Sequence, residues 1–299
     1  MRHFALAACA LCISAASAGC SEDPLTAPED KAAPPAVQAS VSAAAKCPSG
    51  WTAPLIGNAV ILCKRTVTRG GSKVTDYVQV IDLSRGARVV SLAAPTSSVS
   101  TRNPSPSFSR WTVRGWWDQM SRSGRFCAVN GAFFRGYPDG TGSRELSFPL
   151  KHSGTLLTAG GAPLGMASAK DVLILNGSYA QIRAYNLGSV SYSSVRSHLS
   201  SYGTAVVTLA PGGSRPNELN SRTYAGTRDA DGNGRHEILM FYTSANSSAN
   251  DAIGTLTNSF GASRTTQFDG SDSAQLVCKG TTYVSGTRIV PQAFGVYEY

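Results

Sequence analysis

From about residue 50 onward, the chain is a succession of short apolar runs separated by turns that contain Gly, Ser and Asn. Runs of this length, rich in Val, Ile, Thr and aromatic residues, are typical of β-strands. Helical periodicity is found over 112–123, where Val113, Trp116 and Met120 share one face, and over 249–259. The sequence therefore predicts an α+β fold, a strand-dominated mixed-sheet domain with two or three helices. We expect strands at 59–68, 77–83, 87–92, 126–130, 155–158, 172–175, 182–185, 205–209, 265–268 and 288–297, and a hairpin that joins 221–227 to 238–241.

The N-terminus has the pattern of a secretory signal peptide. A short basic start precedes an apolar run over 4–16, which is too short to span a bilayer. The Ala18-Gly19-Cys20 ending resembles a bacterial lipoprotein signal, in which Cys20 would carry the lipid. The alternative is ordinary cleavage after Ala18, because Ala16-Ser17-Ala18 fits the small-x-small pattern.

Residues 21–45 are rich in Pro, Ala and acidic side chains and contain almost no large apolar residue, which is typical of a disordered tether. We therefore expect a signal peptide over 1–20, a tether over 21–45 and one folded domain over 46–299. The predicted location is outside the cytoplasm, either in a bacterial cell envelope as a lipoprotein or as a secreted protein. Contact with the membrane is expected only through the lipid anchor.

The cysteines that remain after the signal peptide also indicate export. An even number of them in an exported chain suggests two disulfides, for which four cysteines allow three connectivities. In one of these connectivities, a Cys47–Cys63 bond closes a local hairpin and a Cys127–Cys278 bond ties the middle of the chain to its end. After the signal peptide there is no Cys-x-x-Cys pair, which argues against a zinc site and thioredoxin-type chemistry in the folded domain. The four cysteines are Cys47, Cys63, Cys127 and Cys278.

The folded part is basic and poor in carboxylates. Residues 46–299 contain 25 Lys and Arg against 14 Asp and Glu. A basic balance is common in nucleic-acid-binding proteins, but the basic residues are scattered rather than clustered, and nucleic acid is an unlikely partner for an exported chain. We expect no nucleic-acid partner and a general attraction for anionic substrates.

Common catalytic motifs are absent: there is no Gly-x-Ser-x-Gly, Ser-x-x-Lys, Walker loop or His-Glu-x-x-His. Instead, four separated motifs stand out. They are Asn130-Gly-Ala-Phe-Phe134; Ser221-Arg-Thr-Tyr-Ala-Gly-Thr227, which enters a hairpin; Gln267-Phe-Asp-Gly-Ser-Asp-Ser273; and Arg288-Ile-Val-Pro-Gln-Ala-Phe294.

In this order, the motifs resemble those of the phosphodiester glycosidase family over roughly 76–297. The resemblance implies hydrolysis of the bond between the anomeric carbon of a sugar and a phosphodiester oxygen. One departure concerns the Asp-Gly-Gly that the family usually shows after its last core strand. Here Asp269-Gly270 is followed by Ser271-Asp272-Ser273, and the added Asp272 changes the local charge.

The chemistry also suggests roles for individual residues. A phosphodiester leaves readily and benefits from positive charge on its oxygens, so one carboxylate and an arginine clamp suffice where an ordinary glycosidase uses two carboxyls. We assign Asp269 as general base or stabiliser of an oxocarbenium-like centre, Arg222 as the bidentate phosphate clamp, and Asn130 as a residue that binds the sugar or orients Asp269. The candidate substrate-binding residues are Ser271, Ser273, Gly270, Gly131, Thr223 and Arg288, the last as a weaker second clamp.

Each of these residues also has a plain structural interpretation. In that interpretation Asp269 caps backbone amides, Arg222 is a solvated strand residue, and the serines belong to an ordinary turn. For Phe133 and Phe134, and for Trp116 and Trp117, burial in the core is favoured over sugar stacking. Residues that lie after the first motif and could line the cleft are Glu145, Lys151 and His152.

Asp229, Asp231 and Asn233 alternate before Gly234, as in the first part of a calcium-binding loop. The twelfth position of such a loop should be a bidentate acid but is Met240, and Glu237 at the ninth position is the possible substitute. A hairpin turn is the safer interpretation. No cofactor is required for the expected reaction, and calcium is possible.

The sequence thus predicts an exported glycosidase that acts on sugar-1-phosphodiesters, with a glycan or sugar phosphodiester as its partner. The alternative is a non-catalytic cell-surface domain that binds anionic glycans. Convergence of Asp269, Arg222 and Asn130 in one place is the structural test common to both.

Overall fold

The computed structural model describes residues 46–134, 144–161, 169–188, 191–212 and 216–299. The predicted signal peptide, the lipidation site Cys20 and the tether lie outside these residues. Among the described residues, no helix is both long and apolar enough to cross a membrane.

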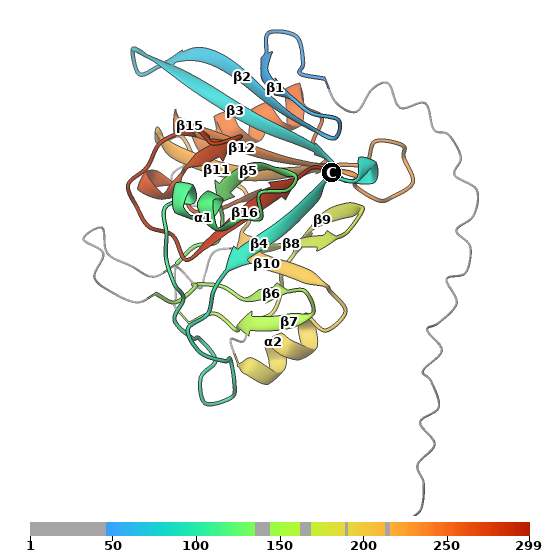
Figure 1. Ribbon diagram of the computed structural model, residues 1–299, viewed down its shortest axis with the longest axis vertical. Helices are drawn as coiled ribbons and strands as arrows, with labels where there is room; N and C mark the ends of the chain where they lie inside the picture. The colour runs from blue at the N-terminus through green and yellow to red at the C-terminus, as the bar shows by residue number, and fades with distance from the viewer. Residues whose placement is uncertain (1–45, 135–143, 162–168, 189–190, 213–215) are drawn as a thin grey trace, which may run out of the picture. The chain divides into compact units, whose positions relative to one another are not determined.

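The described residues form two sheets in which the named strand pairs are antiparallel, with three α-helices (Figure 1). The prediction of a strand-dominated α+β fold is confirmed. The larger sheet has the order β1-β2-β3-β12-β11-β13-β10-β6-β7, and the β8–β9 hairpin also joins it through β10. Its strands are β1 (Thr52–Ile56), β2 (Val60–Arg69), β3 (Ser72–Asp82), β6 (Leu150–His152), β7 (Thr155–Thr158), β8 (Lys170–Asn176), β9 (Tyr179–Ala184), β10 (Thr204–Leu209), β11 (Asn220–Arg228), β12 (Ile238–Ser247) and β13 (Arg264–Gln267).

The smaller sheet has the order β15-β14-β5-β16-β4. It packs on the larger sheet through a core in which the rings of Phe241, Phe268 and Phe294 contact one another, two of the three centroid distances being 5.0 Å. These aromatic residues bury large apolar areas at the centre of the fold, close to where β13 ends. The strands of the smaller sheet are β4 (Arg88–Ala93), β5 (Arg125–Asn130), β14 (Leu276–Cys278), β15 (Thr281–Val284) and β16 (Gln292–Tyr297).

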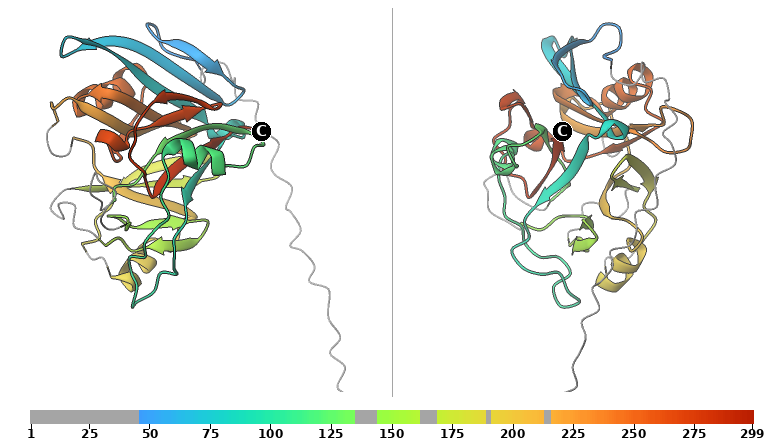
Figure 2. Two further views of the ribbon diagram at one scale, coloured as in Figure 1. Left: turned by 60° about the vertical axis from the view of Figure 1, so that its left-hand side comes forward. Right: turned by 45° about the vertical axis from the view of Figure 1, so that its right-hand side comes forward.

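The helices cover the outer faces of the two sheets. Helix α1 (Val113–Gln119) contacts β5, β14 and β16, and α3 (Ala249–Gly254) packs over a separate core on the other face of the larger sheet (Figure 2). Helix α2 (Tyr192–His198) covers a third core beside β7, β8 and β10. Trp116 and Trp117 are buried, so the core interpretation of this pair is confirmed.

The predicted elements agree with the structure in most places, with local differences that have physical causes. Strand β16 begins at Gln292 rather than at 288, because Pro291 has no N–H to donate to a neighbouring strand. The helix predicted over 112–123 ends after Gln119. The sequence did not predict α2 or the short strands β1, β6, β14 and β15. Three short 3-10 or π segments complete the fold: Leu83–Arg85, Thr255–Ser259 and Ser271–Ser273.

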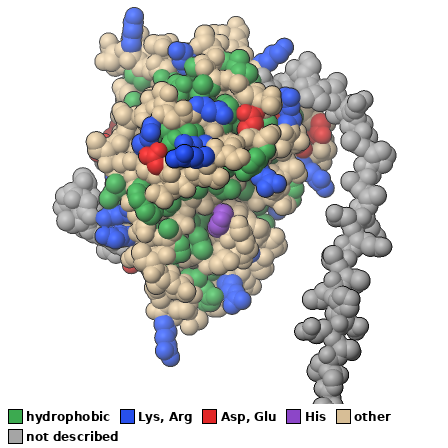
Figure 3. Space-filling view, in the orientation of Figure 1, with side chains coloured by type: hydrophobic (Ala, Val, Ile, Leu, Met, Phe, Trp, Pro, Cys, Tyr) green, Lys and Arg blue, Asp and Glu red, His purple; other side chains and the backbone are tan. Residues whose placement is uncertain are grey.

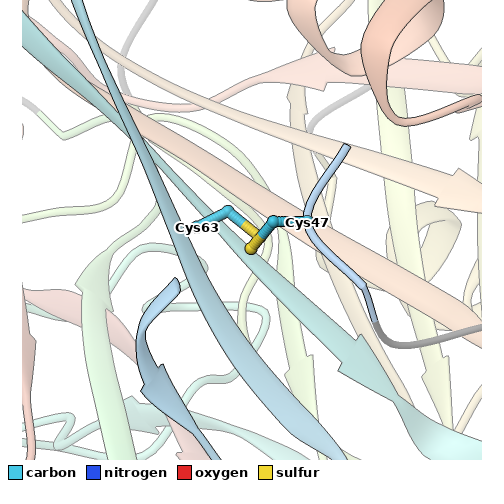
Figure 4. The surroundings of a disulfide bond; sticks show 2 residues. All are labelled: Cys47 and Cys63. Atoms are coloured by element: carbon cyan, nitrogen blue, oxygen red, sulfur yellow. A yellow bond between two sulfur atoms is a disulfide. The ribbon is translucent and has the colours of Figure 1, made fainter. Parts of the chain in front are cut away.

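One disulfide ties the segment before β1 to a strand, and the other joins two paired strands. Cys47 is bonded to Cys63 on β2 (Figure 4), and Cys127 on β5 is bonded to Cys278 on β14. The structure therefore has the connectivity with one local bond and one long-range bond. Disulfides are typical of proteins that fold in an oxidising compartment, which supports an extracellular or secreted protein.

Candidate functional site

Asn130 ends β5 at the junction of the two sheets and has no exposed surface. Its side-chain N–H donates to the backbone oxygen of Asp269 at 2.7 Å. Its amide oxygen accepts from the Thr223 hydroxyl at 2.7 Å and from the Gln275 backbone N–H at 3.1 Å. Asn130 thus connects β5, β11 and the segment from Asp269 to Gln275.

Asp269 follows β13 and the buried Phe268, and it remains partly exposed. Its N–H donates to the Gly131 oxygen at 3.0 Å, and its Oδ1 accepts from the Gly270 N–H at 3.0 Å. Burial raises the pKa of Asp269 to about 6, while the Ser273 hydroxyl, the positive charge of Arg288 and the Gly270 N–H act in the opposite direction. The carboxyl therefore changes charge in a range where many hydrolases work.

Arg288 supplies the positive charge next to this carboxyl. Its guanidinium lies over the ring of Phe134, 4.7 Å from the ring centroid. The Gln275 side-chain N–H donates to the Arg288 backbone oxygen at 2.7 Å. Both contacts restrict the arginine to the part of the chain where Asp269 lies.

Arg110 lies near Arg288, and Arg144 lies near Arg110. Burial lowers the pKa of Arg110, and the positive charges of Arg144 and Arg288 lower it further. We call Arg110, Arg144 and Arg288 the arginine cluster. The cluster therefore adds positive charge on the side of Asp269 where Arg288 lies, and positive charge is what an anionic group would meet there.

The two glycines of the site allow close packing of the backbone. A Cβ added at Gly131 would lie 1.9 Å from Oε1 of Gln292, which accepts from the Ala132 N–H at 2.6 Å. A Cβ added at Gly270 would lie 2.7 Å from the Ser221 backbone oxygen. Neither position can carry a side chain without movement of its neighbours.

The residues after Gly270 form a single 3-10 turn over Ser271–Ser273. Ser273 is buried and faces the Asp269 carboxyl, whereas Ser271 and Asp272 are exposed. The added Asp272 therefore differs from Asp269 in its environment although the two are close in sequence.

Arg222 does not join the site. Thr223 turns its side chain toward Asn130, and neighbouring side chains on a strand point to opposite faces, so Arg222 points away. Its Nη2 donates to the Glu218 backbone oxygen at 2.9 Å, and its Nε donates to the Ser247 oxygen at 3.3 Å. Asn130 and Asp269 therefore lie together, as expected. The Arg222 side chain points away from them, which corrects its expected place as a clamp beside Asp269. Thr223, predicted to bind substrate, instead holds Asn130.

The carboxylates of the candidate calcium loop accept hydrogen bonds from their own turn. Asp229 accepts from the N–H groups of Gly232 and Gly234, both at 2.7 Å, and Asp231 accepts from the Asn233 side chain at 2.8 Å. Ligand atoms of Asp229, Asp231 and Glu237 lie within 4.8 Å of one another. These three carboxylates are therefore compatible with a bound cation. The hydrogen bonds within the loop are equally those of a stable hairpin turn.

The remaining candidates lie in several environments. Phe133 and Phe134 are buried, as expected for core residues. Lys151 donates to backbone oxygens at the end of α2. Glu145 approaches Gly161, where an added Cβ would lie 3.0 Å from its Oε2. No sequence signal distinguished Arg110 and Arg144, because they are single arginines in loops that only the fold brings together.

No protein-family model matches the chain, and no curated protein matches it. Among solved structures, the catalytic domain of zebrafish N-acetylglucosamine-1-phosphodiester alpha-N-acetylglucosaminidase, auto-inhibited by its pro-peptide, is similar. The TM-score is 0.54 at 12% identity, and the match covers 80% of this chain and 83% of that chain. At this identity the likeness shows a shared fold.

Two further structures are similar at lower scores. A hypothetical protein from Synechocystis matches with a TM-score of 0.48 and 11% identity over 81% of this chain and 62% of that chain, so this chain spans less than two thirds of its length. A protein described as exported, from Burkholderia pseudomallei, matches with a TM-score of 0.47 and 12% identity over 76% of this chain and 74% of that chain.

Proposed function

We propose that the chain is an exported hydrolase that cleaves the bond between the anomeric carbon of a sugar and the oxygen of a phosphodiester. The observation that carries this proposal is the partly exposed Asp269 carboxyl, with its pKa raised to about 6, beside the arginine cluster. A carboxylate next to clustered arginines suits a substrate whose leaving group is anionic. The zebrafish domain with the same fold is described as a phosphodiester glycosidase, which supports this class of reaction.

In the proposed reaction, water attacks the anomeric carbon and the bond from that carbon to the phosphodiester oxygen breaks. The bonding electrons leave with the phosphate, whose charge the arginine cluster stabilises. Above pH 6, the ionised Asp269 accepts the proton of the attacking water or stabilises positive charge at the anomeric carbon. A good leaving group makes a second, protonated carboxyl unnecessary.

The neighbours of Asp269 determine its position and charge in this proposal. Asn130 holds the backbone of Asp269, and Phe134 holds the guanidinium of Arg288. Ser273 contributes a hydroxyl near the carboxyl. Ser271 is exposed on the same turn and is proposed to contact the substrate beside the partly exposed Gly270, whereas Gly131 is buried and holds the packing beneath.

Location and charge are consistent with a substrate outside the cytoplasm. On the face shown in Figure 3, Lys and Arg side chains are scattered and acidic side chains are few. We also propose that Cys20 carries a lipid anchor, so that the tether holds the domain near the cell envelope. No step of the proposed reaction involves the candidate calcium loop.

The test is hydrolysis of a panel of α- and β-linked sugar-1-phosphodiesters in water labelled with oxygen-18. We expect release of the sugar with the label on the sugar, because the carbon–oxygen bond breaks. Label on the phosphate would identify a phosphodiesterase and contradict the proposal. Bis-p-nitrophenyl phosphate, which has no anomeric bond, should not react. Binding of the substrates without turnover would support the alternative, a non-catalytic domain that binds anionic glycans.

A further inference from the structure

A cavity lies between the loop over 95–99, β7 and α2. Its volume is about 830 Å³, which lies in the range of cavities that hold small ligands. No residue that forms the Asp269 site or the arginine cluster lines it. The cavity therefore needs an explanation of its own.

The loop that forms one wall is held in place by its own hydrogen bonds. The N–H and hydroxyl of Thr96 donate to the Ser107 oxygen at 2.8 and 3.0 Å. The Asn103 side chain donates to the Ser97 hydroxyl at 3.0 Å. Because Ser97 accepts this bond, its own hydroxyl hydrogen can be donated to a ligand. The wall thus presents fixed hydroxyl groups.

The opposite wall contains positive charge. The Lys151 ammonium donates to the backbone oxygens of Leu199 and Ser200 at 2.8 and 2.9 Å, and this residue is only 7% exposed. Arg196 is exposed, and its guanidinium lies over the ring of Tyr192 at 6.0 Å. No Asp or Glu belongs to the described lining, so two cationic residues line the cavity without a carboxylate beside them.

A ligand that matches these walls has both hydroxyl groups and negative charge. Buried positive charge favours an anionic partner, and Tyr192 provides an aromatic face for a sugar ring. Leu156 and Leu157 add apolar surface beside the serine and threonine hydroxyls. We propose that this cavity is a binding site for anionic saccharides, separate from the Asp269 site and independent of the hydrolysis proposed there.

The proposal is tested by titrating the isotope-labelled full chain with glucose 6-phosphate and following its backbone amide resonances by NMR. We expect saturable shifts at Leu157 and Arg196, which report on this cavity and not on Asp269. Arg196→Gln should raise the Kd about fivefold, as expected for the loss of one exposed charge contact. Arg183→Gln removes an exposed arginine of β9 outside the cavity and should leave the Kd unchanged.

Three further arms test the chemistry of the ligand. Neutral glucose and inorganic phosphate should each bind more weakly than glucose 6-phosphate, because glucose lacks the negative charge and phosphate lacks the sugar ring. Asp269→Asn should leave this binding unchanged. The proposal is wrong if glucose 6-phosphate causes no saturable shifts around the cavity or if Arg196→Gln binds it like the wild type. It is also wrong if glucose or inorganic phosphate binds as tightly as glucose 6-phosphate.

Discussion

At Asp269, burial and nearby positive charge act on one carboxyl in opposite directions. Burial favours the protonated form, while Arg288, Ser273 and the Gly270 N–H favour the ionised form, and the pKa settles at about 6. The ionised carboxylate is therefore a destabilised group in the folded protein at neutral pH. Such a cost is common where a residue is kept for chemistry.

This cost predicts how stability depends on pH. The pKa of Asp269 is higher in the folded protein than its ordinary value of 3.8, so the folded state binds the proton more tightly. The contribution of Asp269 to stability is then lost as pH rises from about 4 to about 6. Asp269→Asn should stabilise the protein at pH 7.5 by on the order of 1–2 kcal/mol, after allowance for the partial exposure of the group, and by close to nothing at pH 4.

Urea unfolding of the wild type and Asp269→Asn at the two pH values measures this difference. Asp272→Asn is the matched control, because Asp272 is exposed on the adjoining turn. Equal effects of the two substitutions at pH 7.5 would mean that the Asp269 carboxyl is not held in the environment described.

Two arginines separate a role in catalysis from a role in folding. Arg288→Gln should lower kcat/KM at least tenfold with little effect on stability, because its charge lies beside Asp269. Arg222→Gln should cost about 1–2 kcal/mol of unfolding free energy and leave kcat/KM within about twofold, because its guanidinium bonds backbone oxygens elsewhere. Steady-state kinetics and urea unfolding on both variants give the answer. A large loss of kcat/KM in Arg222→Gln, with little loss in Arg288→Gln, would instead support Arg222 as the phosphate clamp.

At the scale of elements, the site depends on how closely β5 approaches β16. Gly131→Ala would place a methyl group against the buried side chain of Gln292, which accepts from the Ala132 N–H. We expect a loss of roughly 2–3 kcal/mol of stability and a large loss of activity. Gly188→Ala is the control, since nothing lies within 4 Å of a Cβ added there. Thermal unfolding should separate the two variants clearly, and a Gly131→Ala protein as stable as the control would contradict the packing described.

The sequence predicted elements best where periodicity was strong. The hairpin of β11 and β12 and the helices α1 and α3 were found from their apolar patterns and their glycine turns. Helix α2 was missed because its residues, Tyr192–His198, are mostly polar and Ser-rich, and Ser191 alone supplies the cap. Arg222 was misplaced for a different reason: the sequence shows that it alternates with Thr223, but not which of the two faces the site.

At the scale of the whole molecule, the two disulfides make unequal contributions to stability. The Cys127–Cys278 bond spans 151 residues and the Cys47–Cys63 bond spans 16. Closing the longer loop restricts the unfolded chain more, by about 5 kcal/mol against about 3 kcal/mol. Replacing the Cys127–Cys278 pair by alanine should therefore lower the Tm more than replacing the Cys47–Cys63 pair, as measured by calorimetry. A larger effect of the local pair would contradict this ranking.

The site itself is a product of long-range folding. Asn130 and Asp269 could be selected from sequence because each ends a predicted strand and precedes a glycine. The arginine cluster could not, because Arg110, Arg144 and Arg288 come from three separate loops whose approach depends on the pairing of distant strands. The order of strands in the two sheets is likewise set by tertiary packing rather than by local pattern.

We propose that Asp269 performs the chemistry on an anionic sugar substrate. This role is tested most directly by kcat/KM for a sugar-1-phosphodiester at pH 7.5 with the wild type, Asp269→Asn and Asp272→Asn. We expect a loss of at least about 100-fold for Asp269→Asn, with the folded structure intact, and less than about a threefold change for Asp272→Asn. Hydrolysis by Asp269→Asn at the wild-type rate would contradict it.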